Sequence, residues 1–256
     1  MLLIFLLMRN QTDRPAGERS LRFFAAMNRQ DVFQSESETE RGMPMEHMDE
    51  QWLELIGKQE QMEKQEALKA ALSPENVSQA IQAGELTLGD EVITFQKTEV
   101  VPDQVFMFVP DSFEPMPEEY ARIKYPAERR PQIIYTDETL EINLTVNPTN
   151  NRMVNNEMEQ FVQDLSFLIK RMQPNAKWLG EGVREVGGRK MGFYEFTVPV
   201  LDGVMYNGIF FIELEGKGLF FGLNCMERYQ EQWRPIALGI MDSLQINPME
   251  REEGDS

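Results

Sequence analysis

The sequence contains one cysteine and one histidine, and each shortage excludes a class of chemistry. Cys225 cannot form an intramolecular disulfide, so a disulfide framework is excluded and a reducing compartment is favoured. Because Cys225 lies in an apolar run, we expect a buried, unreactive thiol. A metal site or a Cys-His or Ser-His-Asp mechanism would have to use His47, which lies in a polar segment far from Cys225 in the sequence. We therefore expect no cofactor, no metal and no enzymatic activity.

Basic residues are also scarce, with 25 Lys and Arg against 43 Asp and Glu and a formal net charge of −18. Nucleic-acid binding requires a basic face, so a nucleic-acid partner is not expected. Adsorption to anionic lipid is disfavoured for the same reason. The acidic balance favours a soluble protein with basic partners.

Long apolar runs are missing as well. Residues 1–8 (MLLIFLLM) are apolar but too short to cross a membrane, so no integral membrane segment is expected. They lack a preceding basic stretch and a following cleavage site. We therefore expect a start codon placed too far upstream and a cytoplasmic protein. The alternative is an exported protein with a degenerate N-terminal signal.

What the sequence does contain is a run of strands from Trp178 to Met226. Residues 204–214 (VMYNGIFFIEL) and 219–226 (LFFGLNCM) are apolar on both faces, as in strands that are covered on both sides. Gly187-Gly188 and Gly216-Lys217-Gly218 mark turns between neighbouring strands. These patterns predict an antiparallel meander buried on both faces.

Two amphipathic helices are predicted on either side of this meander. Glu157–Met172 has apolar residues at three- and four-residue spacing, with Asn156 as its expected cap. The second helix is expected to begin near Gln232, because Pro235 is tolerated only in a first helical turn. The fold class is therefore α+β, an antiparallel β-sheet covered by helices on both faces in an α/β/α sandwich.

The rest of the chain suggests four regions. Two helices are expected over residues 49–72 and 73–83, followed by hairpins about Gly89-Asp90 and Asp137-Glu138. Prolines interrupt the connection from Pro110 to Pro131. The predicted regions are a disordered or mis-annotated N-terminal extension (1–48), a helical lead-in (49–88), the α/β/α domain (89–248) and an acidic tail (249–256).

The order of elements resembles that of the PsbP-like fold, shared with DcrB-like bacterial proteins and a Ran-binding nuclear import factor. The resemblance runs from Glu91 to Asn247 and rests on four features. These are the opening strand FMFVP (106–110), the helix MEQFVQDLSFLI (158–169), the glycine turns and the closing helix WRPIALGIMDSL (233–244). It implies an accessory or binding protein without enzymatic activity. Unlike the lipoproteins of that family, this chain has no cysteine near its N-terminus to be lipidated.

The candidate binding surface combines polar residues in strands with a small basic patch: Tyr206, Asn207, Asn224, Arg129 and Arg130. Asn207 and Asn224 interrupt apolar strands, and a buried amide needs hydrogen-bond partners. We favour a role for them in specifying the core, with the lining of a cleft as the alternative. Arg129 and Arg130 are expected to form local ion pairs, with contact to an acidic partner as the alternative.

These observations favour a non-enzymatic protein-binding or chaperone-like accessory module of bacterial type, whose partner is another protein that the sequence does not identify. One alternative is a small-ligand carrier or an enzyme with a cleft near residues 110–131. The other is an exported accessory protein. The oligomeric state does not follow from the sequence.

Overall fold

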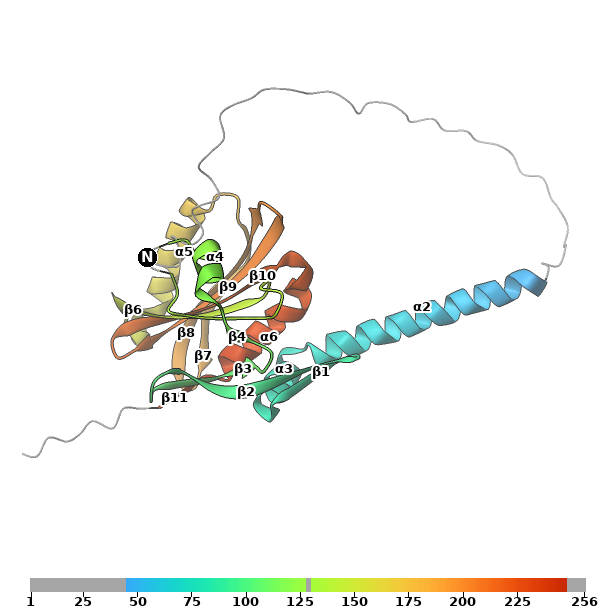
Figure 1. The fold of residues 1–256 in the computed structure, drawn as a ribbon, viewed down its shortest axis with the longest axis horizontal. Helices are drawn as coiled ribbons and strands as arrows, with labels where there is room; N and C mark the ends of the chain where they lie inside the picture. The colour runs from blue at the N-terminus through green and yellow to red at the C-terminus, as the bar shows by residue number, and fades with distance from the viewer. Residues whose placement is uncertain (1–44, 128–129, 248–256) are drawn as a thin grey trace, which may run out of the picture. The chain divides into compact units, whose positions relative to one another are not determined.

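The computed structural model describes residues 45–127 and 130–247 (Figure 1). The described residues divide into two units, residues 45–65 in one and residues 66–127 with 130–247 in the other. Most of the expected N-terminal extension (1–48), all of the expected acidic tail (249–256) and Arg129 lie outside the described residues. The side chains of residues 45–51 also lie outside them.

Two helices open the described chain. Helix α2 spans Met45–Ala71 and helix α3 spans Pro74–Ala83. The Ser73 side chain accepts a hydrogen bond from the backbone N–H of Asn76, and Gly84 ends α3 with a φ of 91°. Both features follow from the sequence, since serine is a favoured N-cap and glycine adopts positive φ without strain.

A seven-stranded antiparallel sheet forms the centre of the larger unit, in the order β4-β5-β6-β10-β9-β8-β7. Its last four strands are the predicted meander, joined by short turns at Gly187-Gly188, Leu201-Asp202 and Glu215-Gly216. The strands are β4 (Glu114–Pro115), β5 (Ile133–Thr136), β6 (Asn143–Arg152), β7 (Lys177–Val186), β8 (Arg189–Val200), β9 (Gly203–Leu214) and β10 (Lys217–Met226).

A second, smaller antiparallel sheet has the order β1-β2-β3-β11. The expected hairpin about Gly89-Asp90 joins its first two strands, and the short last strand follows the final helix. The strands are β1 (Glu85–Leu88), β2 (Glu91–Val101), β3 (Val105–Pro110) and β11 (Gln245–Ile246).

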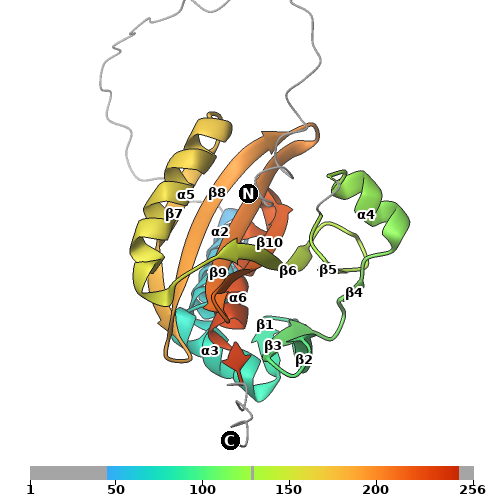
Figure 2. The ribbon, with the colours of Figure 1, turned by 90° about the vertical axis from the view of Figure 1, so that its left-hand side faces the viewer.

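Helices cover both faces of the large sheet, as Figure 2 shows for α5. Helix α5 (Met158–Met172) buries Met158, Val162 and Ile169 against aromatic residues of β8, β9 and β10. Helix α6 (Gln230–Asp242) packs on the opposite face, where it contacts β9, β10 and also β3 of the small sheet. The larger core lies on this second face and includes side chains of α3. The predicted α+β fold with helices on both faces of an antiparallel sheet is therefore confirmed.

The short helix α4 (Glu118–Lys124) lies in the proline-rich connection. Its Ala121 and the residue that follows the helix, Tyr125, pack at the β5 end of the large sheet in a cluster with Ile134 and Met116. Figure 2 shows α4 at the β5 end of the sheet and α5 near β7 and β8, with β6 between them.

Three local expectations were wrong. Helix α5 begins at Met158, and the expected cap Asn156 lies inside the 3₁₀ turn Asn155–Glu157 that precedes it, so no side chain caps the helix. Helix α6 begins at Gln230, so Pro235 lies inside it, where it removes one backbone bond near an exposed helix start. Strand β6 continues past Val146 to Arg152, since its pairing with β10 extends that far.

None of the helices in the described ranges is long and apolar enough to cross a membrane.

Candidate functional site

A row of four polar residues crosses the large sheet on the face that carries α5. Asn207 of β9 is opposite Asn224 of β10, Asn224 is opposite Asn143 of β6, and Asn143 is opposite Thr136 of β5. We call these four residues the polar row. Because opposite residues of antiparallel strands project from the same face, their side chains lie side by side.

Hydrogen bonds join three of the four residues and attach them to Tyr125, the residue directly after α4. The Asn143 amide donates to the Asn224 carbonyl oxygen at 3.1 Å, and the Thr136 hydroxyl donates to the Asn143 carbonyl oxygen at 2.9 Å. The Asn224 amide donates to the Tyr125 hydroxyl oxygen at 3.1 Å. Burial raises the pKa of Tyr125 to about 12, against a smaller opposing effect of its bond to Asn224. The network therefore holds neutral groups at physiological pH, which suit hydrogen bonding and not proton transfer.

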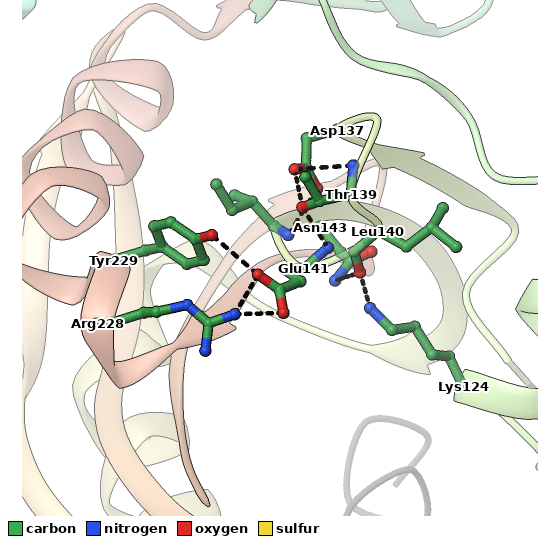
Figure 3. Close-up of polar contacts among 9 residues, drawn as sticks. Lys124, Asp137, Thr139, Leu140, Glu141, Asn143, Arg228 and Tyr229 are labelled. Atoms are coloured by element: carbon green, nitrogen blue, oxygen red, sulfur yellow. Dashed lines mark hydrogen bonds and ion pairs between the residues drawn. The ribbon is translucent and has the colours of Figure 1, made fainter. Parts of the chain in front are cut away.

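The turn between β5 and β6 fixes one end of this row (Figure 3). Asp137 accepts hydrogen bonds from the backbone N–H groups of Ile142 at 2.8 Å and Thr139 at 3.2 Å. The Lys124 ammonium of α4 donates to the carbonyl oxygen of Leu140, which has a φ of 62°. The turn is thus tied to α4 on one side.

On its other side the same turn is tied to the segment that follows β10. Glu141 forms an ion pair with Arg228 and accepts a hydrogen bond from the Tyr229 hydroxyl at 2.9 Å (Figure 3). Hydrogen bonds from Arg228 and Tyr229 hold the pKa of Glu141 below its usual range. The β5–β6 turn is therefore clamped between two segments that are distant in the sequence.

Asn147 extends the polar character of β6 beyond the row. It lies on the same face, opposite Phe220, and is only 1% exposed. Its side-chain amide nitrogen is the one buried side-chain nitrogen or oxygen atom without a hydrogen-bond partner within the described ranges. An unpaired buried amide costs about 1–3 kcal/mol, so this group is a candidate for satisfaction by a bound molecule.

The outer edge of β6 is open next to Asn147. Pairing with β5 ends at Ile133 and Val146, whereas pairing with β10 continues to Arg152. Within residues 45–127 and 130–247, residues 147–152 therefore have a paired strand on one side only. We call residues 147–152 the open edge of β6.

Tyr206 belongs to a different site, on the face that carries α6. Its hydroxyl donates at 2.7 Å to Glu195, which also accepts two hydrogen bonds of 2.8 Å from Arg234. Glu195 is 3% exposed, and burial alone would raise its pKa. The hydrogen bonds from Arg234 and Tyr206 outweigh burial and lower the pKa of Glu195 below its ordinary value. This arrangement anchors α6 on the sheet.

The candidate residues predicted from the sequence therefore do not form one site. Asn207 and Asn224 lie together, and Tyr206 lies on the opposite face. Arg130 forms an ion pair with Glu118 at 3.2 Å, while Arg129 lies outside the described residues. Asn143, Thr136 and Tyr125 could not be identified from the sequence, because only the pairing of strands distant in the sequence brings them near Asn224.

The thiol of Cys225 lies in an environment that disfavours reactivity. Cys225 is buried in β10, as expected, and burial raises its pKa to about 12, far above the range of a reactive thiol. The described part of the chain contains no group of three or more His, Cys, Asp or Glu residues placed to hold a metal ion.

The sequence matches no family model and no curated protein. Among solved structures, the fold is similar to that of cyanobacterial PsbP (CyanoP) from Synechocystis sp. PCC 6803. The TM-score is 0.46 and the identity 14%, over 62% of this chain and 96% of that one. The PsbP-like fold that the sequence resemblance implied is thus found among the structures similar to this chain.

Two further proteins with similar structures are described with other biological roles. LpqN, involved in cell envelope biogenesis of Mycobacterium tuberculosis, has a TM-score of 0.41 at 14% identity, over 61% of this chain and 92% of that one. The immunity protein TplEi of the T6SS from Pseudomonas aeruginosa has a TM-score of 0.36 at 13% identity, over 64% and 75%. Likeness at these identities concerns the fold alone.

Proposed function

We propose that this protein is a non-enzymatic, protein-binding accessory module whose partner contributes an extended segment that pairs with the open edge of β6. The observation that carries the proposal is the buried Asn147 amide without an acceptor, placed at the start of that edge. A polypeptide backbone supplies a carbonyl acceptor for the Asn147 amide. It also supplies hydrogen-bond partners for the backbone groups of the open edge.

The open edge favours a polypeptide over a small ligand. A strand edge presents backbone N–H and C=O groups at regular spacing, and an added strand satisfies them in series. The side-chain amide of Asn147 can donate to a carbonyl oxygen of the same segment. Pro148 removes one donor from the edge, a feature that limits indiscriminate pairing with other chains.

Asn147→Leu tests the proposal. Leucine has a side chain of similar volume to asparagine but no amide to leave unpaired. Without its partner, the variant should therefore be at least as stable as wild type. Partner binding should weaken about tenfold, the effect of one hydrogen bond of about 1.4 kcal/mol. The matched control is Asn143→Leu, which removes an amide that is fully bonded and should lower stability instead.

The partner can be found by photo-crosslinking in native cells. A photo-reactive residue at the exposed position Asn150, on the open edge, should capture a recurrent protein. The same residue at the exposed turn position Asp202 should not. The captured protein then serves as the ligand for the Asn147→Leu measurement. Equal capture from both positions, or unchanged binding by Asn147→Leu, contradicts the proposal.

We place the protein in the cytoplasm as part of this proposal, because its sequence has a single cysteine and so no disulfide framework. N-terminal sequencing of native material tests the location. A mature start at Met43 or Met48 supports the cytoplasmic protein, and a cleaved start directly after the apolar residues 1–8 supports export.

A further inference from the structure

Helix α2 exposes a stripe of large apolar side chains. Trp52, Leu55 and Met62 are 64%, 63% and 63% exposed, and Ile56 is 47% exposed. At 100° per residue these four side chains fall within one third of the helix circumference. Soluble helices normally bury such a stripe, so its exposure marks a surface for another chain.

The spacing of this stripe is that of a coiled coil. Residues 45, 48, 52, 55, 59 and 62 alternate steps of three and four, and their identities are Met, Met, Trp, Leu, Gln and Met. These are the a and d positions of three consecutive heptads, and five of the six are apolar. Such a repeat buries its seam when a second helix with the same repeat packs against it.

We propose that α2 pairs with α2 of a second copy of this chain as a parallel two-stranded coiled coil over residues 45–65. In this pairing Trp52, Leu55 and Met62 each meet the same residue of the partner copy. Gln59 occupies a single a position and meets its counterpart, an arrangement that fixes register and favours two strands.

The flanking charges favour the parallel orientation. Lys58 occupies a g position and Glu63 the following e position, so a parallel pair forms two Lys58–Glu63 ion pairs between the copies. An antiparallel pair centred on the same stripe would bring the two Lys58 side chains together. Lys58 now contacts Glu54 at 2.7 Å, but both are highly exposed, and such pairs are weak enough to exchange.

The seam ends within α2. The next a and d positions are Glu66 and Lys69, which would place like charges of the two copies against each other. Three heptads form a short coiled coil, so we expect a dimer that dissociates on dilution, with a Kd on the order of micromolar. The inference is independent of the proposal for β6, which uses other residues.

The first test is the mass of the full-length protein by sedimentation at increasing concentration. Wild type should shift from one copy to two, and Leu55→Glu should remain a single copy throughout. Gln61→Glu, on the opposite side of the helix, is the control and should behave as wild type. A wild type that stays monomeric, or a Leu55→Glu protein that dimerises equally well, overturns the proposal.

The second test separates the orientations and does not depend on a disruptive charge. In a Cys225→Ala background, Leu55→Cys should form a disulfide with Leu55→Cys of another copy under mild oxidation. A mixture of Trp52→Cys and Met62→Cys chains should cross-link to each other far less. Preferential cross-linking of that mixture would show antiparallel pairing and overturn the parallel assignment.

Discussion

The buried carboxylate of Glu195 depends on Arg234 for the positive charge that compensates its own. Glu195 is almost fully buried, whereas the Arg234 side chain that pairs with it is 41% exposed. The two residues therefore differ in whether water can solvate their charge when the other residue is replaced. Arg234 can regain water, but Glu195 cannot.

We accordingly expect Arg234→Met to destabilise the protein more than Glu195→Gln does. The first change leaves a buried charge without its partner and should cost about 2–4 kcal/mol. The second leaves a solvated guanidinium and a glutamine that can still bond to Tyr206, and should cost about 1–2 kcal/mol. Urea unfolding at neutral pH measures both. Equal losses, or the reverse order, would contradict this assignment.

The pH dependence provides a second check on the same pair. In wild type the pKa of Glu195 is lowered on folding, so its stabilising contribution is present above about pH 4.3, the unfolded pKa, and is lost as pH falls through the folded pKa. Without Arg234, burial raises the folded pKa above the unfolded one. The difference in stability between wild type and Arg234→Met should therefore shrink as the pH is lowered from 7 to about 4.

The pairing of Glu195 with Arg234 also could not be predicted from the sequence. Glu195 alternates with Tyr194 and Phe196, so it lies on the other face of its strand, and the sequence does not show what would pair with its charge there. Its partner is 39 residues away and on a different element. No local pattern connects the two, so the buried ion pair emerges only when α6 is placed on the sheet.

At the scale of elements, the close packing of β8 against α5 depends on Gly192, which has no side chain. A Cβ atom at Gly192 would lie 2.9 Å from Val162 of α5 and closer still to the ring of Phe211 on β9. The aromatic ring occupies the space that any other residue would need. Gly192 thus lets Phe211 and Val162 meet in the core beneath α5.

Gly192→Ala should therefore destabilise the protein by about 1–3 kcal/mol, the usual result of overpacking a core. Gly57→Ala on α2 is the control, because a Cβ there meets nothing within 4 Å and alanine favours the helix. Thermal unfolding followed by circular dichroism compares the two. A Gly192→Ala protein as stable as wild type would show that the ring moves aside without strain.

Elements defined by local patterns could be predicted from the sequence. The apolar spacing of residues 157–172 predicted α5 to within one residue, and glycines predicted two of the three turns of the meander, at Gly187-Gly188 and at Glu215-Gly216. The polar row could not be predicted. Asn143 and Asn224 are 81 residues apart and become neighbours only because β6 pairs with β10. The long end of β6 was missed for the same reason, since residues 147–152 are polar and include a proline.

At the scale of the whole molecule, Cys225 reports on the integrity of the fold. It is the only thiol, it is buried in the central strand β10, and its pKa is raised to about 12. A thiol reagent can therefore reach it only when the sheet opens. At pH 8 the folded protein should resist labelling, and labelling in urea should follow the loss of the circular dichroism signal. Rapid labelling without denaturant would indicate local opening of β10.

The strand order also has a consequence for the chain during its synthesis. Strands β7 to β10 each pair with a strand that is adjacent in the sequence, so each can pair soon after it leaves the ribosome. Strand β6 can pair early with β5, but its other partner is β10, which is complete only when residue 226 has been made. Until then Leu144 and Val146, both fully buried in the finished protein, have nothing to pack against on the β10 side. The segment from β5 to β6 is therefore the part of a nascent chain most in need of protection from aggregation.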